Sequence, residues 1–243
     1  MNTVRIATYN IHKCIGLDRR FAPKRIVKVL RETDADVIAL QEVLCHSSTR
    51  ERENQAGFIA RELGMDYSFG KNRQIRNGPY GNAILSRLEI EESEKFDISI
   101  DKREPRGCLR TRIKLNKTKS IQFFNLHLGT SFFERRKQVH KLLAAHVLDD
   151  KRFTGKRIIA GDFNEWTNGL TTRLFKRKFK GVDARIHLGK RRTYPGVMPF
   201  LHLDHIYFDR DFRLQNAFLH RSRTALIASD HLPIVAEFDL DIL

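Results

Sequence analysis

The chain has 243 residues, enough for one substantial hydrophobic core, and no Pro-, Gly- or Ser-rich linker divides it, so we expect one domain over residues 1–243. Lysine and arginine number 45 against 29 aspartate and glutamate, a net charge of +16. That excess indicates an anionic partner such as nucleic acid, anionic lipid or a phosphorylated small molecule. The 3 cysteines lie far apart and favour neither a disulfide framework nor a zinc site. No apolar run has the length of a signal-peptide core or a membrane span, so we expect a cytoplasmic protein with no transmembrane segment.

The predicted secondary structure consists mainly of short strands with a few helices between them. Alternating and apolar runs indicate strands, and apolar residues that recur at i and i+4 indicate helices. In chain order the predicted elements are a strand at Val4–Ile11, a helix at Ala22–Glu32, a strand at Val37–Gln41, a helix at Glu51–Leu63, strands at Tyr80–Leu85, Cys108–Leu115 and Ile121–Leu128, a helix at Phe132–Leu148, a strand at Arg157–Gly161, an amphipathic helix at Thr172–Lys180, and strands at Leu203–Phe208 and Pro233–Leu240. Strand groups separated by single helices favour sheet-on-sheet packing with helices outside over a regular βαβ array.

Polar residues gather where these strands end. Asp162 and Asn164 follow the buried run Arg157–Gly161, and they need partners or a task, because an unpaired polar group near a core costs about 1–3 kcal/mol. One Asp or Asn after a strand is commonly a turn former or a helix cap. The whole set comprises Asn10, Glu42, Asn125, His127, Asp162, Asn164, Asp204, Asp230 and His231. Rigid scaffolds commonly place their chemistry at such positions, so we expect a site there.

Carboxylates clustered in a basic protein repel one another unless a cation or a proton joins them. Mg²⁺ meets this need, since it takes carboxylate and phosphate oxygens without a fixed ligand spacing, and it polarises a phosphoryl oxygen. A histidine held by a carboxylate, as expected in the segments around Asp204 and His231, can hold or transfer a proton near neutral pH. The residues therefore predict Mg²⁺-assisted attack on phosphorus, with Mn²⁺ as the alternative ion.

Seven motifs carry a resemblance to a known family, in the order TYNIH, DVIALQEV, GNAILSR, FNLHLG, IIAGDFN, LDHIYF and SDHLPIVAEF. From Val4 to Phe238 the chain resembles the endonuclease/exonuclease/phosphatase superfamily, whose fold is that of pancreatic-type deoxyribonuclease. The resemblance implies an α+β class, four-layered α/β sandwich, in which two packed mixed sheets are flanked by helices. It also implies a metal-dependent phosphoesterase, but members act on DNA, RNA, sphingomyelin, phosphoinositides and protein-linked nucleotides, so the fold does not choose the substrate.

The resemblance also implies roles for individual positions. The metal ligands are Glu42, Asn10 and Asp230. The catalytic residues are Asp162, Asn164, His231, Asp204 and His127, of which Asp204 pairs with His231. Arg106 and Asn82 would contact the substrate. Abasic-site endonucleases carry a different motif at His127, which makes that activity the less expected one.

The implied mechanism is in-line attack of a water molecule on phosphorus. The ion on Glu42 binds a phosphate oxygen, while Asn164 and His127 stabilise the developing charge. Either Asp162 or His231 could remove the proton from the water, and we favour Asp162, with His231 protonated against the phosphate.

Short loops would select the substrate, because the chain is near the minimum size for this fold. The candidate loops are Gly70–Tyr80, Gly129–Gln138, Thr172–Lys180 and Gly189–Phe200. In the last loop, Tyr194 with Arg192 could form a platform for a nucleotide base, worth roughly 1–3 kcal/mol per stacked base, or Tyr194 could be a turn residue packed on the sheet. Phe132 and Phe133 could insert into lipid, but we expect them to pack at the start of a helix.

Three hypotheses follow for the function. The first is a divalent-metal-dependent phosphodiesterase that acts as a nuclease on DNA or RNA, favoured by the positive charge. The second keeps the chemistry but uses a phospholipid, as sphingomyelinases do, or a phosphorylated small molecule. The third, a non-catalytic nucleic-acid-binding member, is disfavoured because every residue that the family chemistry needs has a match. Peripheral contact with an anionic membrane, endo- or exonucleolytic action and the oligomeric state stay open.

Overall fold

The strands of the protein form two six-stranded sheets within the residues that the computed structural model describes, which are 3–45, 54–76, 78–144, 147–165, 169–182, 187, 189, 192–195 and 201–240. In spatial order, the first sheet consists of β11 (Leu214–Leu219), β12 (Ile234–Asp239), β1 (Thr3–Asn10), β2 (Val37–Leu44), β4 (Gly78–Ser86) and β3 (Asp66–Ile75). The second consists of β5 (Ile90–Asp97), β6 (Gly107–Lys114), β7 (Ser120–His127), β8 (Lys156–Asp162), β10 (Asp204–Phe208) and β9 (Lys180–Gly181).

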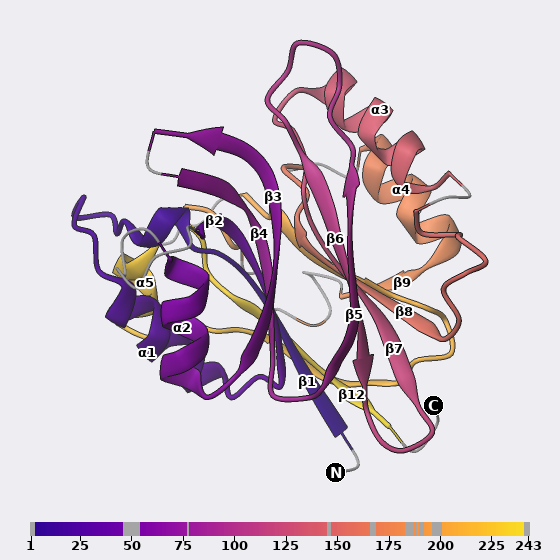
Figure 1. Ribbon diagram of the computed structural model, residues 1–243, viewed down its shortest axis with the longest axis horizontal. Coiled ribbons are helices and arrows are strands. Elements are labelled where there is room, and N and C mark those ends of the chain that lie inside the picture. Colours follow the sequence, from indigo (N-terminus) through magenta and orange to yellow (C-terminus); the bar gives the residue numbers. More distant parts are fainter. Residues whose placement is uncertain are drawn as a thin grey trace.

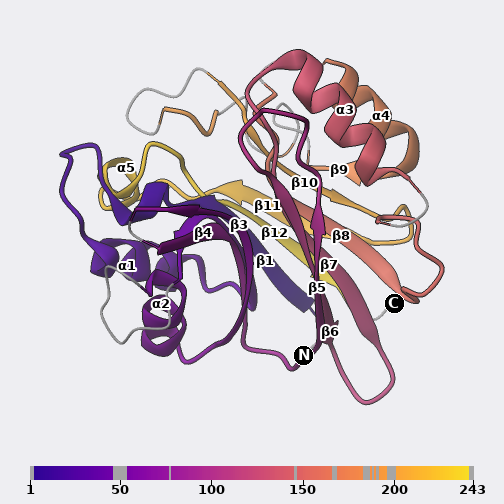
Figure 2. The same cartoon turned by 45° about the horizontal axis from the view of Figure 1, so that its top comes forward.

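The sheets pack face to face, and helices cover their outer faces (Figure 1). On the first sheet lie α1 (Pro23–Thr33), α2 (Gln55–Leu63) and α5 (Ala225–Ala228), and on the second lie α3 (Phe132–Leu142) and α4 (Leu170–Lys178) (Figure 2). The fold is therefore the four-layered α/β sandwich that the resemblance implied. None of the helices in the described part of the chain is both long enough and apolar enough to cross a bilayer.

Alternation along the strands builds two apolar cores, because successive strand residues point to opposite faces of a sheet. In β7, Phe123 joins the core between the sheets, and Phe124 joins the core between the second sheet and its helices. Phe175 of α4 and Phe179 directly after it are buried in the second core. The second sheet is thus covered on both faces, which accounts for the apolar run in β8.

Two parallel strand pairs decide where the polar strand ends meet. β1 pairs in parallel with β2, and β7 pairs in parallel with β8, so within each pair the carboxyl ends lie at the same edge. Asn10 at the end of β1 contacts Asp162 at the end of β8, with Nδ2 and Oδ2 3.1 Å apart. Strand ends from both sheets therefore face a common region.

Three of the four segments expected to select the substrate consist mainly of regular secondary structure. The loop predicted at Gly70–Tyr80 was wrong, since most of it belongs to the β3–β4 hairpin. Most of Gly129–Gln138 is the first part of α3. Thr172–Lys180 is mainly α4, as expected for an amphipathic helix. Gly189–Phe200 lies largely outside the described residues.

Two predicted helices are shorter in the structure. The helix predicted over Phe132–Leu148 ends at Leu142, and the N–H of Leu148 turns back to the carbonyl oxygen of Leu142 at 3.0 Å. The packing expected for Phe132 and Phe133 was wrong, since their side chains are 48% and 73% exposed. The helix predicted at Glu51–Leu63 begins at Gln55, after the N-cap at Asn54. Residues 51–53 lie outside the described residues.

Candidate active site

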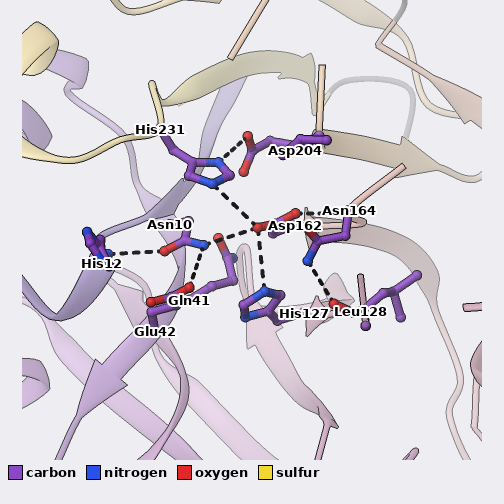
Figure 3. A network of polar contacts seen from close by, with 12 residues as sticks. Asn10, His12, Gln41, Glu42, His127, Leu128, Asp162, Asn164, Asp204 and His231 are labelled. Atoms are coloured by element: carbon purple, nitrogen blue, oxygen red, sulfur yellow. Dashed lines mark hydrogen bonds and ion pairs between the residues drawn. The ribbon is translucent and has the colours of Figure 1, made fainter. Parts of the chain in front are cut away.

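Three polar residues occupy neighbouring positions at one end of the second sheet. His127 ends β7, Asp162 ends β8 and Asp204 begins β10, and the strand register pairs Asp162 with both of the others. Directly paired residues on neighbouring strands point to the same face, so the three side chains converge (Figure 3). Asn10 reaches the group from the first sheet through its hydrogen bond to Asp162.

The backbone around this group is strained. Of the eight non-glycine residues with positive φ among those described, five lie here. Their φ values are +42° at His12, +56° at Lys13, +60° at Cys14, +59° at Glu42 and +48° at Asn164. Residues with a Cβ rarely adopt such angles, which cost of order 1–3 kcal/mol each. The β2–β4 register also shifts across the stretch that contains Glu42. The fold thus holds side chains in place here at a local cost, which is typical of functional sites.

Asp162 lies at the centre of the group. Its Oδ1 accepts the backbone N–H of Asn164 at 2.9 Å, and its Oδ2 accepts Nδ2 of Asn10 at 3.1 Å. The same Oδ2 lies 3.5 Å from Nε2 of His127 and 3.7 Å from Nε2 of His231. Burial raises the pKa of the Asp162 carboxyl to about 7, although the positive charge of His231 acts to lower it. A carboxylate with a pKa near 7 is suited to accept a proton at neutral pH.

His231 and Asp204 form a buried hydrogen-bonded pair. Nδ1 of His231 donates to Oδ2 of Asp204 at 2.8 Å, which leaves Nε2 directed toward Asp162. Burial alone would lower the pKa of His231, but the carboxylates of Asp204 and Asp162 outweigh it and raise the pKa to about 10. His231 is therefore an imidazolium at neutral pH.

Arg106 fixes the orientation of His127. A guanidinium N–H of Arg106 donates to Nδ1 of His127 at 3.0 Å, so the ring proton lies on Nε2, which faces Asp162. Burial and the positive charge of Arg106 hold the pKa of His127 well below its usual range, so the ring is neutral. The structure thus places Arg106 behind His127, and the predicted contact of Arg106 with the substrate phosphate stays a prediction.

The predicted metal ligands Asn10, Glu42 and Asp230 lie in strands of the first sheet or just before one of them. Nδ2 of Asn10 donates to Oε1 of Glu42 at 3.3 Å. The hydroxyl of Ser229 donates to the backbone carbonyl of Asn10 at 2.8 Å and lies 3.2 Å from Oδ1 of Asp230. The structure therefore links Asn10 to both acidic residues.

Glu42 is an ionised carboxylate in a positive environment. Burial acts to raise its pKa, but the positive groups around it, among them the Lys13 ammonium, lower the pKa. Because His127 is neutral, the positive group in contact with Glu42 is the ammonium of Lys13. Its Nζ lies 3.0 Å from Oε2 of Glu42.

Two sets of residues are candidates to hold a cation. Asp162, Asp204 and His231 offer ligand atoms within 4.8 Å of one another, but the imidazolium of His231 has no free lone pair for a metal. Glu42 and Asp230 offer carboxylate oxygens, the donors that hard divalent cations prefer. The donor chemistry therefore fits such an ion on the Glu42 side.

A buried polar network beneath the site ties the two sheets together. Nε2 of Gln41 donates to Oδ1 of Asn125 at 2.8 Å, and Nδ2 of Asn125 donates to the carbonyl oxygens of Leu40 and Ala83, each at 2.8 Å. Asn125 belongs to the second sheet and its three partners belong to the first, so these bonds fix the sheet spacing directly below the candidate catalytic residues.

We expect Asn125→Ala to lower the free energy of unfolding by about 2–4 kcal/mol, because it leaves the buried polar groups of Gln41, Leu40 and Ala83 without this partner. Urea denaturation measures the change. Asn216→Ala, at an exposed position on β11, is the control and should shift stability by less than about 0.5 kcal/mol. A loss below about 1 kcal/mol for Asn125→Ala would mean that the network is not structural.

The predicted substrate contacts differ in their placement. The Tyr194 ring lies 4.9 Å from the His231 ring between centroids, beside the candidate catalytic residues. Arg192, two residues earlier, is exposed. Asn82 is buried on β4 and donates to the carbonyl oxygen of Gly107 at 3.0 Å, so it fastens the first sheet to the second. Contact of each with substrate stays a prediction.

The sequence analysis did not single out Lys13, Gln41 or Ser229, which the structure places among the site residues. Gln41 and Ser229 directly precede Glu42 and Asp230, so adjacency to a predicted ligand was an available signal. Lys13 follows the YNIH motif, but its direction depends on positive φ angles that no pattern of apolar residues reveals.

Comparison with known proteins identifies the relatives of the chain. The model of the Endonuclease/Exonuclease/phosphatase family matches residues 7–231. Protein YbhP of Escherichia coli K12 is 32% identical over 248 aligned residues, which cover 97% of this chain and 96% of YbhP. A family member from Bacteroides thetaiotaomicron has a TM-score of 0.80 at 19% identity, with 98% of each chain covered. The mannosyl-6-phosphatase of that species has a TM-score of 0.77 at 19% identity, with 97% of this chain and 99% of that one covered.

The two structural relatives share the fold at low sequence identity, and they leave the substrate of this chain undecided. The family match is different in kind, because it follows the sequence itself from β1 to His231. It contains the strand ends that carry the site described above. The chain therefore belongs to the endonuclease/exonuclease/phosphatase family.

Proposed function

We propose that the protein is a divalent-metal-dependent phosphodiesterase, which hydrolyses nucleic acid by in-line attack of water on phosphorus. The observation that carries this proposal is the setting of Asp162, whose raised pKa of about 7 coexists with protonated His231 and neutral His127 on either side. A proton acceptor beside two N–H donors is the arrangement that hydrolysis of a phosphoester requires. The net charge of +16 supports a polyanionic substrate.

In this proposal Asp162 takes the proton of the attacking water. The backbone N–H of Asn164 and Nδ2 of Asn10 hold the two carboxylate oxygens, so the acceptor is fixed in orientation. Nδ2 of Asn164 donates to the carbonyl oxygen of Leu128 at 2.8 Å, and its second N–H is left for the phosphate.

The two histidines stabilise the negative charge that develops on the phosphate. His231 contributes a positively charged Nε2–H, and His127 contributes a neutral Nε2–H held in place by Arg106. Glu42 and Asp230 would hold Mg²⁺ or Mn²⁺, and a bound ion would polarise a phosphoryl oxygen as a Lewis acid.

The pH dependence of kcat/KM should be bell-shaped. The rate is expected to rise as Asp162 loses its proton through about pH 7, and to fall as His231 loses its proton through about pH 10. Initial rates between pH 5 and pH 11 on a substrate without its own titration measure both limbs. A rate that falls from pH 5 to pH 8 would contradict the assignment of Asp162 as the base.

A phospholipid is the second candidate substrate, and the exposed aromatic pair Phe132 and Phe133 favours it. These rings begin α3 five residues beyond His127, and the exposed residues that follow include Arg136 and Lys137. Aromatic and basic side chains on one surface suit the interface of an anionic membrane.

A substrate panel tests the proposal. It contains plasmid DNA, single-stranded DNA, RNA, sphingomyelin, anionic phospholipid, p-nitrophenyl phosphate and bis-p-nitrophenyl phosphate, each with Mg²⁺, with Mn²⁺ and with chelator. The proposal expects metal-dependent cleavage that is fastest on nucleic acid. Faster cleavage of a lipid selects the second candidate, and no cleavage by folded, metal-loaded protein contradicts both.

The cytoplasmic location stays a prediction.

A further inference from the structure

Lys13 forms an ion pair with Glu42, the residue that is best suited to hold the metal ion. Its Nζ is 3.0 Å from Oε2 of Glu42, and the two side chains are only 30% and 19% exposed. The ammonium group also lies 5.9 Å from the centroid of the Tyr80 ring. This is a partly desolvated ion pair inside the site, where each charge affects the other more than it would on an open surface.

The turn that carries Lys13 is strained and firmly anchored. The 3-10 turn η1 (His12–Cys14) consists of three successive residues with positive φ, none of them glycine. Nε2 of Gln55 donates to the carbonyl oxygen of Lys13 at 2.8 Å, and the N–H of Ala22 donates to the carbonyl oxygen of Cys14 at 2.9 Å. Glycine would relieve this strain but would remove the side chains. The strain therefore indicates that the side chains of the turn have a function.

The same turn faces both predicted acidic ligands. Nδ1 of His12 lies 3.8 Å from Oδ1 of Asp230, while Lys13 contacts Glu42. Lys13 offsets the charge of Glu42. A divalent cation on Glu42 would compete with the Lys13 ammonium for the same carboxylate and would repel it, since both are positive. The flexible stem of the lysine would allow the freed ammonium to turn to a phosphate bound by that ion.

We propose that Lys13, which pairs with Glu42, is a substrate-binding residue that moves to a non-bridging oxygen of the substrate phosphate when a divalent cation occupies Glu42. The inference rests on the proposed function and adds to it a second role for one side chain. Lys13 limits metal affinity before the substrate arrives, and it adds affinity for the phosphate afterwards. A lysine suits this exchange, because its ammonium is a compact charge on a flexible stem.

Lys13→Met tests the exchange through two independent readouts. Binding of Mn²⁺ to substrate-free protein, followed by electron paramagnetic resonance, should become about tenfold tighter, because a competing cation is removed. With a substrate from the panel, KM should rise about tenfold or more, while kcat changes less, since the lost contact is to the phosphate in both ground and transition states.

Matched variants separate this inference from the proposed function. Lys95→Met removes an exposed lysine of β5, whose Nζ contacts a backbone carbonyl, and should leave Mn²⁺ affinity and KM unchanged. Glu42→Gln should lose Mn²⁺ binding, and if the wild-type protein itself binds no Mn²⁺, the proposed function and this inference both fail. If Glu42→Gln loses Mn²⁺ binding but Lys13→Met binds Mn²⁺ no more tightly than the wild type, the inference about Lys13 is overturned and the proposed function stands.

Discussion

Asp162→Asn is expected to lower kcat/KM by about 10³-fold or more, while the protein remains folded. The amide keeps the size of the side chain and can still accept the N–H of Asn164, but it cannot take a proton from water. A positioned general base contributes about 10²–10⁴-fold to a rate, and this variant also removes a charge next to His231. Oδ2 of Asp162 accepts Nδ2 of Asn10, and the amide NH2 that replaces it places donor against donor, so the free energy of unfolding should fall by about 1–3 kcal/mol, too little to unfold the protein.

The measurement is kcat/KM on the best substrate of the panel, together with urea denaturation of the same samples. Glu89→Gln is the matched control, since it makes the same change of charge at an exposed residue that pairs with Lys114. It should retain the wild-type rate. An Asp162→Asn protein within tenfold of the wild type would remove Asp162 from the chemistry.

Asp204→Asn should move the alkaline limb of the pH profile to lower pH and reduce kcat/KM at pH 8 by about 10²-fold. His231 is buried, and burial alone would lower its pKa, so its proton depends on the Asp204 carboxylate 2.8 Å away. Without that charge His231 loses its proton near or below neutrality, and the positively charged donor beside Asp162 is lost.

Two experiments measure the protonation of His231 in Asp204→Asn. NMR titration of the His231 ring should show a pKa of about 10 in the wild type and a pKa lower by several units in Asp204→Asn. The pH profile of kcat/KM should shift by the same amount, because both report one group. A large fall in rate with an unmoved alkaline limb would show that Asp204 acts through structure and not through the charge of His231.

The strands that the sequence analysis missed share one physical property. β3, β5, β9 and β11 are the outermost strands of the two sheets. An edge strand has a neighbour on one side only and is commonly exposed and charged, so it lacks the apolar run that identifies an inner strand. β5 shows this clearly, with the sequence IEESEKFD and mostly exposed residues. The inner strands, which have a neighbouring strand on each side, were all predicted.

The candidate site was predictable where its residues follow an apolar strand. Asp162, His127 and Asp204 stand at strand ends in the sequence, and strand register brings them together. Residues that depend on unusual backbone angles were not predictable in the same way. Lys13 reaches Glu42 only because the turn that carries it and the residue it meets both have positive φ. Glu42 could thus be named from the sequence as a candidate ligand, but the lysine that contacts it could not.

Hydrolysis in ¹⁸O-labelled water tests the central claim most directly. A phosphoester from the panel is cleaved with Mg²⁺ in labelled water, and the products are analysed by mass spectrometry. Direct attack of water on phosphorus, with Asp162 as its base, predicts one ¹⁸O in the phosphoryl product and none in the alcohol. It also predicts no turnover with chelator and a rate lowered about 10³-fold or more with Asp162→Asn. Label in the alcohol, or undiminished cleavage by Asp162→Asn, would contradict the account.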